Sequence, residues 1–90
     1  MNYSTHLLRH LRLTIGQNIH HQRTTQKLPL RKLAKLTGLS ENLLDQYELG
    51  KNDIRLDALL KIACALEVDA EKLLDGFAGV CAKRLVPPLA

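Results

Sequence analysis

Hydrophobic residues recur every three to four positions along most of this chain, which is the spacing of one helical face. Ile15 and Ile19, four residues apart, predict a helix from about Leu13 to Gln26. Three leucines upstream either extend this helix backwards or belong to a separate arm: Leu7, Leu8 and Leu11. Pro29 disfavours helix at the residue before it and suits a first turn, so a second helix is expected to begin there.

The stretch from residue 30 to 51, LRKLAKLTGLSENLLDQYELGK, predicts two short amphipathic helices joined by a tight turn. Gly38 lies at the turn, where glycine accepts a positive φ without steric cost. Ser40 follows and can cap the next helix by accepting a backbone N–H. Two helices packed at a steep angle in this way form a helix-turn-helix, whose second helix can enter a DNA major groove.

The apolar positions of these two helices indicate which faces are buried. In the first helix, Leu33 and Leu36 are expected to share the buried face. In the second, Leu43 or Leu44 is expected to be buried together with Tyr47.

The second half of the chain predicts two more helices. Gly50 is expected to cap the preceding helix, within a loop over 49–53. A fourth helix, ending near Glu67, is indicated by apolar residues at helical spacing: Leu56, Leu59, Leu60, Ala63 and Leu66. Asp69 can cap a short fifth helix that carries Leu73 and Leu74. Residues 80–90 show no helical period and are expected to form a tail or an edge strand.

The expected fold class is therefore all-α, a compact five-helix domain that contains a helix-turn-helix. We expect an N-terminal arm or helical extension over residues 1–12, the helix-turn-helix domain over 13–75 and a C-terminal tail over 76–90. The length of 90 residues fits one small domain. With two Tyr, one Phe and no Trp, its core is expected to be aliphatic.

Cysteine content gives no sign of a disulfide framework or of a zinc site. The chain has two cysteines and no CxxC pair. Cys64 lies in an apolar helical stretch and is expected to be a buried small hydrophobic residue. Neither a signal peptide nor a membrane-spanning run is visible, so a reducing cytoplasmic location is expected.

Charge is distributed unevenly along the chain. Residues 1–40 carry seven Lys or Arg and no acid, whereas residues 41–75 carry nine acids and four bases. A basic block of this kind commonly contacts phosphate, although pairing between the basic and acidic halves is an alternative.

Residues 15–74 resemble the Cro/phage-repressor (XRE-type) helix-turn-helix family. The resemblance is carried by IGQNIHHQR, LRKLAKLTGLS, YELGK and LDALLKIACALEVDAEKLL, which follow one another at the family's spacing. It implies a five-helix domain that binds double-stranded DNA, usually as a homodimer on a palindromic operator. The expected function is a sequence-specific transcriptional regulator, a small repressor or activator such as those of phages, plasmids and mobile elements.

The resemblance also implies roles for individual residues. Arg23 and Glu48 match an internal ion pair behind the recognition helix, which is a structural role. The positions that face base edges are occupied by Ser40, Glu41, Asn42 and Gln46. The DNA backbone is expected to be contacted by Arg31, Lys51, Asn52 and Arg55. Asn and Gln suit base reading because an amide can bond adenine N6 and N7 together.

Some residues depart from the family pattern. Leu30 replaces a Gln that reaches a phosphate, and Pro29 replaces the usual capping residue. Glu41 and Asp45 place acids on the recognition helix, where they either favour the helix macrodipole or pair with nearby bases, namely Arg31, Lys35 or Lys51. These acids leave open an alternative function: a protein-interaction module on the same scaffold, such as an antitoxin or a transcription-machinery adaptor.

Other candidate chemistry is weak. His6 and His10 have the spacing of half a zinc site, but no motif completes it, so no metal or other cofactor is expected. No nucleophile framework or phosphate loop is present, so an enzyme is not expected. The dimer interface is left open between the N-terminal leucines and the apolar residues of the tail, which are Phe77, Val80, Leu85 and Val86.

Overall fold

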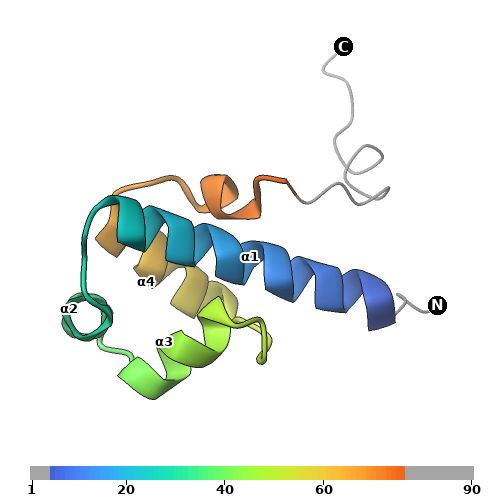
Figure 1. Cartoon of the computed structure of the whole chain (residues 1–90), viewed down its shortest axis with the longest axis horizontal. Coiled ribbons are helices and arrows are strands. Elements are labelled where there is room, and N and C mark those ends of the chain that lie inside the picture. The colour runs from blue at the N-terminus through green and yellow to red at the C-terminus, as the bar shows by residue number, and fades with distance from the viewer. Residues whose placement is uncertain (1–4, 77–90) are drawn as a thin grey trace, which may run out of the picture.

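The computed structural model describes residues 5–76, which form four α-helices and one 3-10 helix (Figure 1). The elements in chain order are α1 (Thr5–Thr25), α2 (Leu30–Thr37), α3 (Glu41–Glu48), α4 (Leu56–Leu66) and the 3-10 helix η1 (Ala70–Leu74). Those residues contain no strand, as the sequence predicts. The predictions for the tail and for its dimerisation residues lie outside the described part of the chain.

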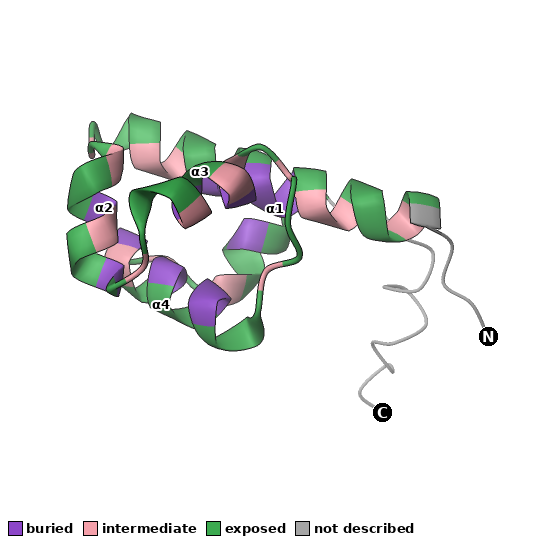
Figure 2. Cartoon of the chain, turned by 90° about the horizontal axis from the view of Figure 1, so that it is seen from below, coloured by how far each residue is buried: buried purple, intermediate pink, exposed green. Residues whose placement is uncertain are grey.

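The core is aliphatic, as its composition predicts. Every helix contributes at least one fully buried side chain: Ile19, Leu33, Leu44, Ile62, Leu66 and Leu73. Tyr47 is the one aromatic residue among the buried side chains of residues 6–76. In Figure 2 the buried segments of the helices face one another across the interior.

Helix α1 is continuous from Thr5, so the upstream leucines extend it and do not form a separate arm. Its buried residues begin only with Thr14, and residues 6–13 are exposed or half-buried. The first turns therefore project beyond the bundle (Figure 2).

Gly16 brings α1 and α3 into backbone contact. A Cβ atom at this position would lie 2.3 Å from the carbonyl oxygen of Tyr47 and 2.7 Å from that of Glu48. Both distances are shorter than any van der Waals contact, so only glycine allows the helices to approach this closely. The spacing of apolar residues gave no indication of this contact, which fixes where α3 lies.

The predicted fifth helix is the short 3-10 helix η1. Asp69 stands at its N-cap, but its side chain makes no capping hydrogen bond. The N–H of Lys72 donates to the carbonyl of Asp69 at 2.9 Å, which is the i→i+3 pattern of a 3-10 helix. Asn18 of α1 then donates to the carbonyls of Leu73 and Asp75, at 2.8 Å each. These carbonyls therefore bond to the side chain of Asn18 on α1 and not to N–H groups of a longer helix.

Several apolar residues that were expected inside are exposed. Leu36 is 55% exposed, because α2 buries the stripe formed by Leu33 and Thr37. On α4, Leu56 and Leu60 are 71% and 52% exposed. Cys64, one turn beyond Leu60, is exposed as well, which corrects the prediction that it is buried. Each helix buries a single stripe, and periodicity does not decide which of two adjacent apolar residues belongs to it.

Candidate nucleic-acid interface

The turn between α2 and α3 is held by local hydrogen bonds. Gly38 adopts a left-handed conformation with φ of 77° and donates its N–H to the carbonyl of Ala34 at 2.8 Å. Ser40 caps α3 by accepting the N–H of Leu43 on its Oγ at 3.0 Å. Both predictions for this turn are confirmed, and together the two residues fix the direction in which α3 begins.

The outer face of α3 is polar. The helix buries Leu44 and Tyr47 completely or nearly so, whereas Leu43 is half-buried. The opposite side exposes three residues in the first two turns: Glu41, Asn42 and Asp45. Gln46 is half-buried at one edge of this face. Helical spacing therefore gathers three of the expected base-reading residues on one side, with the exposed Ser40 directly before them.

The end of α3 brings loop residues against Gln46. Gly50 takes φ of 72° and donates to the carbonyl of Tyr47, while the N–H of Lys51 donates to the carbonyl of Gln46 at 2.9 Å. This pair of bonds is a Schellman motif. Asn52 Nδ2 then donates a hydrogen bond to Oε1 of Gln46. Asn52, which is expected to contact the DNA backbone, thus contacts Gln46, which is expected to read a base.

Arg55 stands at the N-cap of α4 with its side chain 82% exposed. Its Nε lies 3.2 Å from Oδ1 of Asp57. Desolvation acts to raise the pKa of Asp57, but the charge and hydrogen bond of Arg55, together with the backbone of Ala58 and the charge of Lys61, outweigh it and leave that pKa lowered. An ion pair this exposed is weak, so a phosphate can compete for the guanidinium.

Cations of α2 line two shallow hollows, and the first of these hollows also borders the start of α3. One, of about 560 Å³, is lined by Arg31 and Lys35 together with Ser40 and Glu41. The neighbouring hollow, of about 500 Å³, is lined by the same two cations together with Lys27 and Lys32. Within residues 5–76 none of these four cations forms an ion pair.

Sequence reasoning assigned only Arg31 of this cluster to the interface and counted the three lysines as part of a basic block. The i,i+4 spacing of Arg31 and Lys35 could have identified Lys35 as well, because it places both on one face of α2.

Glu41 and Asp45 do not pair with the bases that the sequence suggested. Neither carboxylate forms an ion pair within the described chain. Asp45 lines a hollow with Arg23 and Glu48, and its charge helps to raise the pKa of Arg23. Its charge thus favours the charged form of Arg23, while its own side chain stays exposed to solvent.

Arg23 and Glu48 form a nearly buried, bidentate ion pair between α1 and α3. Arg23 Nε donates to Glu48 Oε2 at 2.6 Å, and its Nη2 donates to Oε1 at 3.0 Å. Nη1 donates to the carbonyl of Leu28 at 2.9 Å, and His20 Nδ1 lies 2.9 Å from Oε1. The hydrogen bond to Glu48 is the main cause that raises the pKa of Arg23, against the opposing effect of burial. This geometry ties α3 to α1 and to the segment that precedes α2.

Alternative chemistry finds no support among the described residues. No three His, Cys, Asp or Glu side chains of residues 5–76 gather in a way that could hold a metal ion. His6 and His10 are both exposed on α1. None of the described helices is long and apolar enough to cross a membrane.

Comparison with known proteins identifies the class. The helix-turn-helix family model matches residues 19–73. The chain is similar in structure to the restriction-modification controller protein C.AhdI from Aeromonas hydrophila, with 31% identity and a TM-score of 0.67. That match covers 69% of this chain and 94% of C.AhdI.

A second similar structure is the clp gene regulator ClgR from Corynebacterium glutamicum. Its two crystal structures match with TM-scores of 0.71 and 0.72 at 26% and 25% identity. The first match covers 77% of this chain and 90% of ClgR, and the second covers 83% and 80%. No curated protein sequence matches the chain.

This chain belongs to the Cro/phage-repressor (XRE-type) helix-turn-helix family. It is a DNA-binding transcriptional regulator.

Proposed function

We propose that this regulator reads the major groove with the outer face of α3, as a homodimer on a palindromic operator. The observation that carries the proposal is the junction of α2 and α3. There the cations Arg31 and Lys35 share one hollow with the N-cap and the first residue of α3, Ser40 and Glu41. Groups able to bond base edges thus adjoin cations able to hold phosphates, and sequence-specific recognition needs both kinds of contact.

The base-reading roles follow from the chemistry of each side chain. Asn42 and Gln46 carry amides that can donate to N7 and accept from N6 of adenine. Glu41 can accept from N4 of cytosine. Ser40 already accepts a hydrogen bond from the backbone, so its O–H is the group left to donate to a base.

The DNA backbone is contacted by exposed cations and by an amide around α3. Arg31 and Lys35 approach phosphates from the side of α2, and Lys51 and Arg55 approach from the loop and the start of α4. Asn52 donates a hydrogen bond from its amide to Gln46 and contacts the DNA backbone beside Gln46. Arg23 and Glu48 keep a structural role, because their side chains are 14% and 6% exposed and already bonded to each other.

Such a protein acts by occupying its operator and needs no catalytic step. We place it in the cytoplasm, where a bacterial or phage operator would be reached. Whether it represses or activates depends on where the operator lies relative to the promoter.

The salt dependence of binding to random duplex DNA tests the proposal. Four phosphate contacts in each protomer predict that log K falls with log salt with a slope of about −3.6 for each protomer bound, or about −7 for the homodimer, since each contact contributes about −0.9. Fluorescence anisotropy at several salt concentrations measures this slope. A slope near zero would exclude phosphate contact and remove the proposed interface.

The alternative, a protein-interaction module, is favoured by the exposed carboxylates of Glu41 and Asp45, which have no ion-pair partner in the described chain. A basic partner protein would be attracted to this face. The two functions differ in how DNA affinity responds when these charges are removed.

A further inference from the structure

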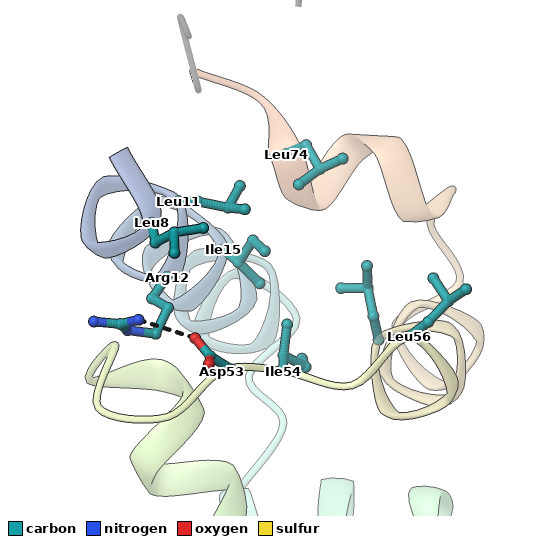
Figure 3. Close-up of a pocket in the computed structure, with 9 residues that line it drawn as sticks. Leu8, Leu11, Arg12, Ile15, Asp53, Ile54, Leu56 and Leu74 are labelled. Atoms are coloured by element: carbon teal, nitrogen blue, oxygen red, sulfur yellow. Dashed lines mark hydrogen bonds and ion pairs between the residues drawn. The ribbon is translucent and has the colours of Figure 1, made fainter. Parts of the chain in front are cut away.

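An apolar groove runs between the N-terminal half of α1, the loop before α4 and η1 (Figure 3). Its volume is about 370 Å³. Three leucines from three different elements stand at its rim: Leu8 of α1, Leu56 of α4 and Leu74 of η1, which are 44%, 71% and 38% exposed. Figure 3 shows these side chains converging on one space, with Ile54 and Ile15 beneath them.

This groove is distinct from the DNA-facing surface. None of its lining residues belongs to α2 or α3. Arg12 lines the same groove, and its Nε is a buried donor that lacks a hydrogen-bond partner among the described residues. Exposed leucines gathered around one hollow indicate a surface that another apolar segment covers, and the free donor indicates a backbone carbonyl within that segment.

We propose that residues 77–90 of the same chain dock into this groove. The described chain ends at Gly76, two residues after Leu74 at the rim, so the following residues begin beside the groove. Gly76 takes φ of 88°, a left-handed conformation that turns the chain sharply after η1. The segment then supplies five large apolar side chains: Phe77, Val80, Leu85, Val86 and Leu89.

Charge and length also fit this occupant. The only charged side chains of the segment are Lys83 and Arg84. The rim of the groove carries the carboxylate of Asp53, which pairs with Arg12 at 2.9 Å and, being 85% exposed, stays open to a second cation. Fourteen residues in extended form reach roughly 46 Å, at about 3.3 Å per residue. The segment is therefore long enough to cross the groove.

Tethering favours this segment over a second copy of the chain. A segment attached at the rim experiences an effective concentration in the millimolar range, whereas a second molecule must compete at its own, lower concentration. Docking would also anchor the first turns of α1, which otherwise project with Leu8 exposed on this side.

The test uses the Phe77→Trp variant of the full chain, because the protein has no other tryptophan. Docking predicts fluorescence emission at shorter wavelength than that of the same variant unfolded in urea. A further Leu8→Ser or Leu56→Ser change should reverse most of that shift. Leu36→Ser is the matched control, because Leu36 is an exposed leucine on α2 that does not line the groove, and it should leave the emission unchanged. Circular dichroism verifies that each variant keeps its helices.

Three outcomes would overturn the proposal. Emission equal to that of the unfolded chain would show that Phe77 is not covered. A shift insensitive to Leu8→Ser and Leu56→Ser would place the segment elsewhere. A shift that disappears on dilution, together with a change of mass in light scattering, would assign the groove to a second copy. None of these measurements involves DNA, so the result is independent of the proposed operator binding.

Discussion

At the scale of single residues, the contact between Asn52 and Gln46 is the most informative for recognition. The amide of Asn52 donates to Oε1 of Gln46, which leaves both N–H groups of Gln46 and one lone pair of Oε1 available. These remaining groups still match N7 and N6 of adenine. The side chain of Leu30 on α2 has no polar group that could bond to α3, and the side-chain hydrogen bond to Gln46 comes from the loop after α3.

Gln46→Ala and Lys51→Ala separate base reading from phosphate binding. Gln46→Ala should cost about 1–3 kcal/mol on the preferred site and relax the preference at one base pair. Lys51→Ala should weaken binding to all duplexes alike and flatten the salt slope by about one unit. Titrations of both variants against preferred and random DNA make the comparison. If both lose only non-specific affinity, α3 does not lie in the groove.

At the scale of elements, the position of α3 is set by two glycines through different physical causes. Gly38 is required for its left-handed backbone, since nothing lies within 4 Å of a Cβ placed there. Gly16 is required for the approach of α1 to the carbonyls of α3. The ion pair of Arg23 and Glu48 spans the same two helices, so packing and electrostatics hold α3 at one place.

Substituting each glycine by alanine distinguishes the two causes. Gly38→Ala should destabilise the fold by about 1–2 kcal/mol, the cost of a left-handed non-glycine residue. Gly16→Ala gains about 1 kcal/mol of helix propensity, but its Cβ meets backbone atoms that no side-chain rotation can move. We expect a net loss of roughly 3 kcal/mol, at the upper end for overpacking. Urea unfolding measures both, and a Gly16→Ala protein as stable as wild type would refute the close contact.

The acidic face of α3 decides between a DNA reader and a protein-interaction module. Replacing Glu41 and Asp45 with Gln removes two negative charges that would face a polyanion. For a DNA reader, affinity for random duplex should rise, most at low salt where screening is weakest. For a protein-interaction module, DNA affinity should stay negligible while binding to a basic partner is lost.

Titration of the wild type and the double variant at two salt concentrations measures this effect. The double change Glu67→Gln and Glu71→Gln is the matched control for net charge, because it removes two exposed carboxylates that lie outside α2 and α3 and form no ion pair in the described chain. Equal affinity of wild type and double variant at both concentrations would contradict the DNA-facing assignment of α3.

At the scale of the whole molecule, the uneven charge of the sequence is only partly neutralised within the fold. Arg12 and Arg23 of the basic block pair with Asp53 and Glu48 of the acidic half. The cations of α2, in contrast, form no ion pair in the described chain. Pairing between the two halves, one of the two alternatives from the sequence, is thus carried by Arg12 and Arg23, and the cations of α2 are left for the phosphate contact that we propose.

Two-fold recognition of an operator makes a prediction about spacing. A homodimer that reads a palindrome should contact half-sites about 34 Å apart, the length of one helical turn of DNA. Inserting half a turn, about five base pairs, between the half-sites should abolish cooperative binding, whereas a full turn should reduce it less. Gel-shift stoichiometry with these operators measures it. Equal affinity for one isolated half-site would argue against a dimer.

The sequence by itself determined the helical class, the turn at Gly38, the cap at Ser40 and the residues exposed on α3, because these depend on local periodicity and backbone preference. It also matched Arg23 with Glu48, through the family pattern. Only the tertiary structure decided which leucines are buried, since Leu36, Leu56 and Leu60 fit the helical period as well as their buried neighbours do. The close approach at Gly16 and the apolar groove arise between elements distant in the chain, and no local pattern encodes how those elements pack. The bond from Asn52 to Gln46 spans only six residues, but it depends on how the loop turns back at Gly50, which helical periodicity does not encode.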